Sequence, residues 1–188
     1  GPCDISVAEM VGAYTAFARK GVRRYPLYVT RIEDSNGDVV AEFTPRVREV
    51  ISEDAACKMV TLMRGVIDSG TGHRMRARYH LTVPMAGKTG TTNDNSDGWF
   101  VGYTPSLSFG GWVGGEERDI HFASMAIGQG ANAALPISAY FLMKVFADKS
   151  LGYSQEEDFD IPEGFDPCGQ TDESETEEEI AVEPVLDN

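Results

Sequence analysis

Three runs rich in β-forming residues follow one another with only short gaps between them: Met85–Thr92, Gly98–Tyr103 and Leu107–Val113. The gaps, Asn93–Asp97 and Thr104–Ser106, consist of residue types that favour turns. Parallel neighbours would need a crossover of about a dozen or more residues, and neither gap has room for one. The segment is therefore predicted to form an antiparallel meander, around which the rest of the fold has to be arranged.

Helical patterns are predicted on both sides of this meander. Ser6 and Glu9 form a capping-box pattern before apolar residues at helical spacing, and Gly21 ends the run. Ser52 is placed to cap a second helix, whose apolar residues form one stripe. A last helix is expected at about Ala133–Asp148.

A hairpin is predicted between the first two helices. Tyr28–Ile32 and Val39–Phe43 are rich in β-forming residues, and the polar stretch between them contains Asn36-Gly37, a strong hairpin signal. The order of elements is then helix, hairpin, helix, three strands and helix. Because it lacks the regular strand and helix alternation of a parallel sheet, the predicted fold class is α+β: an antiparallel sheet flanked by helices.

The net charge of −14 is distributed very unevenly along the chain. Residues 1–150 contain 16 Lys and Arg against 16 Asp and Glu, whereas residues 151–188 contain 14 Asp and Glu and no Lys or Arg. An acidic stretch without sustained apolar periodicity cannot bury enough surface to offset its ordering entropy. We expect a domain over residues 1–150 and an acidic tail over residues 151–188, disordered from about residue 155. Such a tail usually only solubilises, and a docking or regulatory role is the alternative.

Charge and composition argue against several classes of function. A neutral body with an acidic tail does not fit nucleic acid or an anionic lipid surface, so neither is expected as a partner. No apolar run approaches the roughly 18–20 residues of a membrane span. The three cysteines and three histidines lack disulfide-framework and metal-ligand spacing, so no metal and no cofactor is expected.

The first strand of the meander, Ala86–Thr92, combines a lysine, three threonines and two glycines. Side chains two apart on a strand share a face, so Lys88 and Gly90 are expected on one face and Thr89 and Thr91 on the other. Gly90 would let a ligand approach the backbone closely, where the Thr91 N–H can donate and the Lys88 ammonium can meet a carboxylate. An ordinary exposed lysine on a surface strand is the alternative.

Gly87-Lys88-Thr89 also ends like a phosphate-binding Walker A motif. That motif needs a glycine five residues before Gly87, where this sequence has Thr82, and a helix directly after the threonine. Pro84 would lie inside the loop, and turn-forming residues follow instead of a helix. No nucleotide-binding loop is therefore expected.

Several ordered blocks of residues resemble one protein family. They are Gly70–Gly72, Ala86–Thr92, Asp97–Pro105 and Gly111–Gly114, with Met10–Tyr14 and Phe17–Gly21 in the first helix and Ala134–Pro136 at the last. Together they look like the C-terminal half of the transpeptidase domain of bifunctional (class A) penicillin-binding proteins, in the penicillin-binding and serine β-lactamase-like superfamily. The likeness extends from residue 3 to about residue 148.

This resemblance implies acyl transfer on peptidoglycan stem peptides. In the family a serine attacks the bond between two D-alanines, an amine of a neighbouring stem takes the acyl group, and β-lactams mimic the D-alanyl pair. Lys88 matches the lysine that holds the substrate carboxylate, and Thr89 and Thr91 match its hydroxyl partners around Gly90. The Thr91 backbone N–H matches one of two oxyanion donors.

The sequence departs from the family pattern because it contains neither Ser-x-x-Lys nor Ser-x-Asn. The nucleophile, the general-base lysine and the second motif are therefore expected upstream of Gly1, and the isolated chain is expected to be inactive. The expected partners are that upstream half, stem peptides and β-lactams.

The resemblance also implies a location in the periplasm or at the outer face of the cytoplasmic membrane, with an anchor upstream. The leading function is D,D-transpeptidation. A serine β-lactamase or D,D-carboxypeptidase and a non-catalytic penicillin-binding sensor or scaffold are the alternatives.

Two further interpretations concern residues outside the lysine strand. Arg74, Arg76 and Arg78 alternate with apolar residues like one face of a strand, and we expect a solvated face, with a grip on an anionic stem peptide as the alternative. Trp99 and Trp112 lie beside glycines in predicted strands, where large rings most often form core between sheet and helix.

Overall fold

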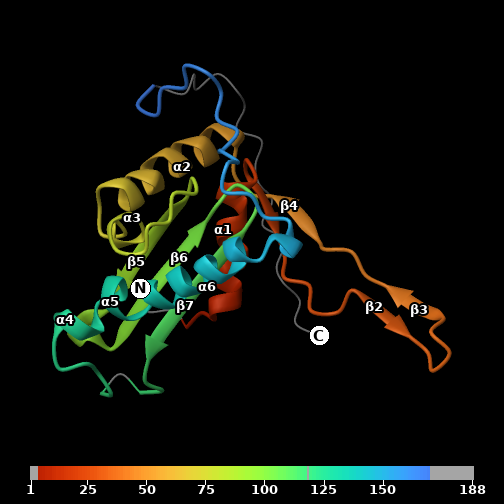
Figure 1. Cartoon of the computed structure of the whole chain (residues 1–188), viewed down its shortest axis with the longest axis horizontal. Helices are drawn as coiled ribbons and strands as arrows, with labels where there is room; N and C mark the ends of the chain where they lie inside the picture. The colour runs from red at the N-terminus through yellow and green to blue at the C-terminus, as the bar shows by residue number, and fades with distance from the viewer. Residues whose placement is uncertain (1–3, 118, 170–188) are drawn as a thin grey trace.

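The computed structural model describes residues 4–117 and 119–169 and is built around the predicted meander. Its strands are β5 (Ala86–Thr91), β6 (Asp97–Tyr103) and β7 (Ser108–Gly114), which form an antiparallel sheet in the order β5-β6-β7. Helices lie on both faces of this sheet, with α6 in front of it and α1 behind it in Figure 1. The predicted α+β class, an antiparallel sheet flanked by helices, is confirmed.

The helices begin where the sequence predicts. In α1 (Val7–Ala18) the Ser6 hydroxyl accepts from the Glu9 N–H, and the Glu9 carboxylate accepts from the Ser6 N–H at 2.8 Å. These two bonds satisfy groups that a helix start leaves unpaired. Ser52 caps α2 (Glu53–Asp68) in the same way through the Ala55 N–H.

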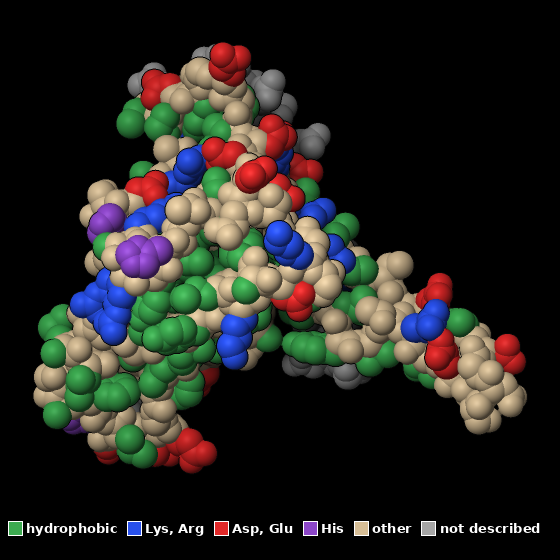
Figure 2. All heavy atoms as spheres, in the orientation of Figure 1, with side chains coloured by type: hydrophobic (Ala, Val, Ile, Leu, Met, Phe, Trp, Pro, Cys, Tyr) green, Lys and Arg blue, Asp and Glu red, His purple; other side chains and the backbone are tan. Residues whose placement is uncertain are grey.

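The C-terminal part of the body contains several shorter elements before its last long helix. They are α4 (Met125–Gly128) and α5 (Gly130–Ala133); the long helix α6 (Leu135–Ala147) follows, and the 3-10 turn η2 (Lys149–Leu151) comes after it. The helix predicted at 133–148 is therefore confirmed as α6, with α5 as a separate turn before it. Figure 2 shows apolar side chains over the α6 side of the body, and α6 exposes Ile137, Tyr140, Phe141 and Met143.

The two faces of the sheet bury different side chains. On one face Phe100 and Phe109 pack with Leu135 and Leu142 of α6. On the other face Ala86 and Tyr103 pack with residues of α1 and α2. The central strand β6 contributes Phe100 to one cluster and Tyr103 to the other, because successive side chains alternate between faces.

A hairpin projects from the body as an arm, as Figures 1 and 2 show. Its strands β2 (Arg31–Glu33) and β3 (Val39–Glu42) are antiparallel, and Gly37 between them has φ +88°. The predicted hairpin is confirmed, although its first strand begins later than expected. At its base β1 (Val22–Arg24) pairs with β4 (Val47–Glu49).

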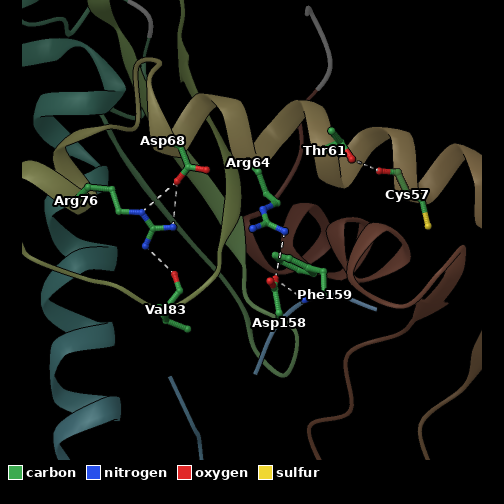
Figure 3. A network of polar contacts seen from close by, with 8 residues as sticks. All are labelled: Cys57, Thr61, Arg64, Asp68, Arg76, Val83, Asp158 and Phe159. Atoms are coloured by element: carbon green, nitrogen blue, oxygen red, sulfur yellow. Dashed lines mark hydrogen bonds and ion pairs between the residues drawn. The ribbon is translucent and has the colours of Figure 1, made fainter. Parts of the chain in front are cut away.

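The arginine-rich link forms a helical turn, α3 (Arg74–Ala77), so the prediction of an alternating strand face is wrong. The turn buries Met75 completely and directs Arg76 inward. Arg76 Nη1 donates to the carbonyl oxygens of Leu81 and Val83, both at 2.7 Å, and Asp68 lies 3.2 Å from the same guanidinium (Figure 3). In this turn the guanidinium bonds two carbonyl oxygens and a carboxylate at once, and these charge-assisted bonds help to stabilise it.

The chain returns to the body after α6. Phe159 and Ile161 pack against the cluster formed by α1, α2 and β6. The tail boundary expected near residue 155 is therefore corrected: residues 158–161, here called the return segment, are held because these two apolar side chains are placed against a preformed apolar surface. For residues 170–188, which lie outside the described part of the chain, disorder stays a prediction.

Replacing Arg76 by alanine should destabilise the protein, because two carbonyl groups of buried residues lose a charged donor. We expect the free energy of unfolding to fall by about 2–4 kcal/mol. The exposed Arg78, whose guanidinium lies 5.7 Å from the Tyr79 ring centre, provides the control: Arg78→Ala should change it by less than about 1 kcal/mol. Urea denaturation followed by circular dichroism measures both values, and equal losses would contradict the role given to Arg76.

Candidate functional site

The candidate site is built on the edge of β5 that faces away from β6. Among residues 4–117 and 119–169, β5 pairs with β6 alone. The Thr92 N–H donates to the Asp97 carbonyl at 3.1 Å, so Thr92 directs its backbone groups toward β6. Because backbone groups alternate along a strand, those of Thr89 and Thr91 point to the other edge. The Thr91 N–H is thus presented at an edge to which no described strand is bonded.

The Lys88 ammonium lies at this same edge. Its Nζ donates to the Thr89 carbonyl oxygen at 2.8 Å, which agrees with the outward direction of that carbonyl. The Lys88 side chain is exposed, so the ammonium keeps two further protons for a ligand or for water. A cation and a backbone donor that no described strand pairs are therefore presented at the same edge of β5.

The predicted division of side chains between the two faces of β5 is confirmed. The Thr89 hydroxyl lies 2.6 Å from the Thr71 hydroxyl, just beyond α2. The Thr91 hydroxyl accepts from the Gly130 N–H of α5 at 3.0 Å. Lys88 instead pairs in register with Val101, on the face covered by α1. The threonines thus hold β5 to its neighbours while the lysine faces a cavity.

This cavity has a volume of about 630 Å³ and lies between α1 and the Lys88 face of the sheet. Its lining includes Met10 and Tyr14 from α1, residues 88–92, and the rings of Trp99 and Trp112. Burial raises the pKa of the Tyr14 hydroxyl, which keeps that wall of the cavity uncharged. The cavity is large enough for a peptide or a drug-sized ligand.

The two tryptophans do not form core between sheet and helix, so that prediction is wrong. Trp99 is half-buried and Trp112 is 36% exposed. The register aligns Gly90, Trp99 and Trp112 in one row on the Lys88 face, where the rings line the cavity. Phe100 on the opposite face takes the core position instead.

Asp97 organises the end of this row. Its carboxylate accepts from Trp112 Nε1 at 2.7 Å and from the Thr92 hydroxyl at 3.0 Å. The second bond holds the turn after Thr92, and the first fixes the Trp112 ring. One carboxylate therefore fixes both the end of the lysine strand and a ring of the cavity.

The sequence did not reveal the supporting contacts of two residues, Thr71, which lies in the Gly70–Gly72 block, and Gly130. Gly130 lies so close to the sheet that a Cβ there would be 2.2 Å from the Trp99 carbonyl oxygen and 2.3 Å from that of Gly90. Only a glycine allows α5 to approach β5 this closely. The glycine-rich stretch before the last helix was the available signal, but its contact partners lie far away in the sequence.

The described residues provide a cation, Lys88, and a backbone donor, the Thr91 N–H, but no activated nucleophile. In the part of the chain that the structure describes, no hydrogen bond joins a serine hydroxyl to a lysine or histidine. Within the same residues no cluster of His, Cys, Asp and Glu could hold a metal ion, and no helix is long and apolar enough to cross a membrane. The described residues thus bring together an ammonium group, a strand edge and a cavity lined in part by aromatic rings.

Comparisons with known proteins show the family to which the chain belongs. The family model for the penicillin-binding protein transpeptidase domain matches residues 1–137. Penicillin-binding protein 1A of Aquifex aeolicus is 33% identical over 162 residues, which cover 86% of this chain and 21% of that protein. Penicillin-binding protein 2a of Streptococcus pneumoniae is 34% identical over 130 residues, 65% of this chain and 17% of that protein. The chain therefore belongs to the penicillin-binding protein transpeptidase domain family, and it spans only a small part of the length of these relatives.

Solved structures share the fold. Penicillin-binding protein 1A from Haemophilus influenzae superposes with a TM-score of 0.69 at 20% identity, over 77% of this chain and 27% of that one. The D,D-transpeptidase domain of a peptidoglycan glycosyltransferase from Eggerthella lenta gives 0.53 at 24% identity, over 74% and 32%. Penicillin-binding protein A from M. tuberculosis, solved as an imipenem acyl-enzyme complex, gives 0.60 at 18%, over 76% and 32%. At these identities the likeness concerns the fold alone.

Replacing Gly130 by alanine should disrupt the contact between α5 and β5. The added Cβ would meet backbone oxygens that cannot move aside, so we expect a loss of about 1–3 kcal/mol in the free energy of unfolding. Gly65 in α2 gives the matched control, because a Cβ there meets nothing within 4 Å. Gly65→Ala should stabilise the protein by about 0.5–1 kcal/mol. Thermal and urea unfolding of both variants tests this, and a Gly130→Ala protein as stable as the parent would refute the close approach.

Proposed function

We propose that this chain supplies one wall of the active site of a D,D-transpeptidase that cross-links peptidoglycan stem peptides. The observation that carries the proposal is the unpaired edge of β5, where the Thr91 N–H and the Lys88 ammonium are presented together. The family membership supports the reaction class. The catalytic serine and its base would come from a part of the parent protein outside this chain.

The β5 edge suits an extended peptide substrate. A stem peptide could add alongside β5 as a further strand, with its backbone bonded to the outward groups of Thr89 and Thr91. Gly90 keeps the strand surface open on the Lys88 side. The substrate's terminal carboxylate would then be bound by the Lys88 ammonium in a charge-assisted hydrogen bond.

The reaction would proceed in two acyl-transfer steps. The serine oxygen attacks the carbonyl carbon of the penultimate D-alanine, and the negative charge on the carbonyl oxygen is stabilised by the Thr91 N–H. Collapse of this intermediate breaks the C–N bond, and the terminal D-alanine leaves after its nitrogen accepts a proton. An amine of a second stem then attacks the ester and releases the serine.

The two threonine hydroxyls have partners within the fold, which refines the roles implied by the resemblance. The Thr91 hydroxyl is occupied by the Gly130 N–H, so we propose that Thr91 acts on the substrate through its backbone. The Thr89 hydroxyl pairs with Thr71 and can reach a ligand only from that side of the strand. Lys88 then carries most of the side-chain contribution to carboxylate binding.

The parent protein would act in the periplasm or at the outer face of the cytoplasmic membrane, with an anchor outside this chain. Its binding partners would be stem peptides, β-lactams and the upstream half of the same polypeptide. The matched relatives are named penicillin-binding proteins, which favours a transpeptidase over a serine β-lactamase. We further propose that the domain ends near residue 150, followed by the return segment and an acidic tail.

Removing the Lys88 ammonium should slow acylation in the complete parent protein. A charge-assisted hydrogen bond is worth about 1.5–3 kcal/mol, so Lys88→Ala should reduce acylation by benzylpenicillin roughly 10- to 200-fold. Lys88→Arg should not fully restore the rate, because a planar guanidinium cannot occupy the position of a point charge. Lys58→Ala on α2, which removes only an ion pair with Asp54, should keep the parental rate. Stopped-flow measurement gives the rates, and parental acylation by Lys88→Ala would refute the assignment.

The isolated chain should form no covalent adduct with fluorescent penicillin, because the sequence contains no Ser-x-x-Lys. Labelling is measured on denaturing gels beside the complete parent. A labelled band from the isolated chain would mean that one of its own serines is the nucleophile.

Thr91→Ala in the complete parent protein provides a comparison for Lys88→Ala. It keeps the Thr91 backbone N–H, so it should slow acylation less than Lys88→Ala does.

A further inference from the structure

The return segment places one aromatic ring at the junction of three elements. The Phe159 ring centre lies 5.7 Å from that of Tyr103 on β6, in an edge-on arrangement. The Arg64 guanidinium of α2 lies 5.8 Å from the same ring (Figure 3). Tyr14 and Phe17 of α1 each lie 6.3 Å from the Tyr103 ring. Phe159 thus completes an aromatic cluster that joins α1 to the sheet.

Two ion pairs flank this ring, one on each side along the return segment. Asp158 Oδ1 lies 3.2 Å from Arg64 Nη1 on α2. Asp160 pairs with Lys20, at the end of α1, at 2.5 Å, and Glu53 at the start of α2 approaches the same lysine at 2.9 Å. The hydrogen bonds that the Lys20 ammonium donates, first to Asp160 and then to Glu53, raise its pKa. Phe159 and Ile161 therefore meet an apolar surface, and Asp158 and Asp160 each meet a cation beside it.

The cluster reaches the candidate active site through Tyr14. This tyrosine packs against Tyr103 in the cluster and also lines the cavity that Lys88 faces. Phe159 and Ile161 pack on the cluster that contains Tyr14. A shift of α1 away from the sheet would move Tyr14 and Met10, which line the cavity on its α1 side.

We propose that the return segment is a strap that fixes α1 against α2 and β6, and that Phe159 is thereby a positioning residue for the Lys88 cavity. The occupant of the surface between α1 and α2 is residues 158–161 of this chain. The fixation of α1 is independent of the proposed function, whereas the effect on the cavity as a substrate site rests on it.

Hydrogen exchange of the full chain tests the fixation of α1. In Phe159→Ala, amides of α1 should exchange at least about tenfold faster than in the parent sequence, while amides of α6 keep their rates. Phe165→Ala is the matched control, because Phe165 is in the same C-terminal stretch but is not among the side chains packed on this cluster. Parental exchange of α1 in Phe159→Ala, or equal acceleration by Phe165→Ala, would overturn the proposal.

Phe159→Ala could loosen the whole fold, so that α6 also exchanges faster. A charge-reversal series tests the strap in that event. Asp158→Arg should place two cations together and accelerate exchange in α1 by up to about fivefold, the size expected for an exposed pair. The double variant Asp158→Arg with Arg64→Glu should recover part of that protection. Failure of the single variant to accelerate exchange, or of the double variant to recover any protection, would also contradict the strap.

Acylation kinetics of the complete parent protein test the effect on the cavity. Phe159→Ala should raise the apparent dissociation constant for benzylpenicillin about three- to tenfold and leave the limiting acylation rate within about twofold, because the ring positions the cavity without touching the reacting atoms. Phe159→Tyr should restore tight binding, since it keeps an aromatic ring. If α1 exchanges faster in Phe159→Ala but the dissociation constant is unchanged, Phe159 does not position the cavity. The proposed function would be refuted separately, by Lys88→Ala acylating at the parental rate.

Discussion

The structure depends on a β5 strand that is hydrogen bonded along one edge only. The bonded edge fixes β5 to β6 and sets the register of the whole sheet. The other edge leaves the backbone groups of Thr89 and Thr91 unpaired by any described strand. An open edge normally invites association with any extended chain, so its presence beside an ammonium group suits selective binding of a peptide that ends in a carboxylate.

Such an edge is useful only if the strand cannot shift, and the fold holds β5 from both faces. On the threonine face, Thr71 and Gly130 bond the side chains that a flexible strand would leave free. On the lysine face, α1 covers the sheet and is itself tied down by the return segment. Segments far from the lysine in sequence thereby determine where its ammonium lies. The proposed stabilisation of an oxyanion requires preorganised donors, and this arrangement would supply them.

The sequence predicted the elements whose signals are local. The capping residues Ser6 and Ser52, the Asn36-Gly37 turn and the short gaps of the meander each fix their structure within a few positions. Contacts between distant segments were not predictable in this way. The tryptophans were misplaced because the sequence does not show that a cavity lies between α1 and the sheet. The arginine link was misassigned because the burial of Met75 and the bonds from Arg76 to the carbonyls of Leu81 and Val83 decide its conformation, and a residue pattern shows neither. The return segment was missed because its four residues hold only two apolar side chains, too few to show a pattern.

The central claim is that the β5 edge forms one wall of a serine acyl-transfer site. A crystal structure of the complete parent protein acylated by benzylpenicillin would test it most directly. The account predicts the Thr91 nitrogen about 2.7–3.1 Å from the carbonyl oxygen of the acyl ester, with the Lys88 ammonium turned toward the penicillin carboxylate. An adduct whose carbonyl oxygen is bonded elsewhere, or a β5 edge covered by another strand of the parent, would contradict it.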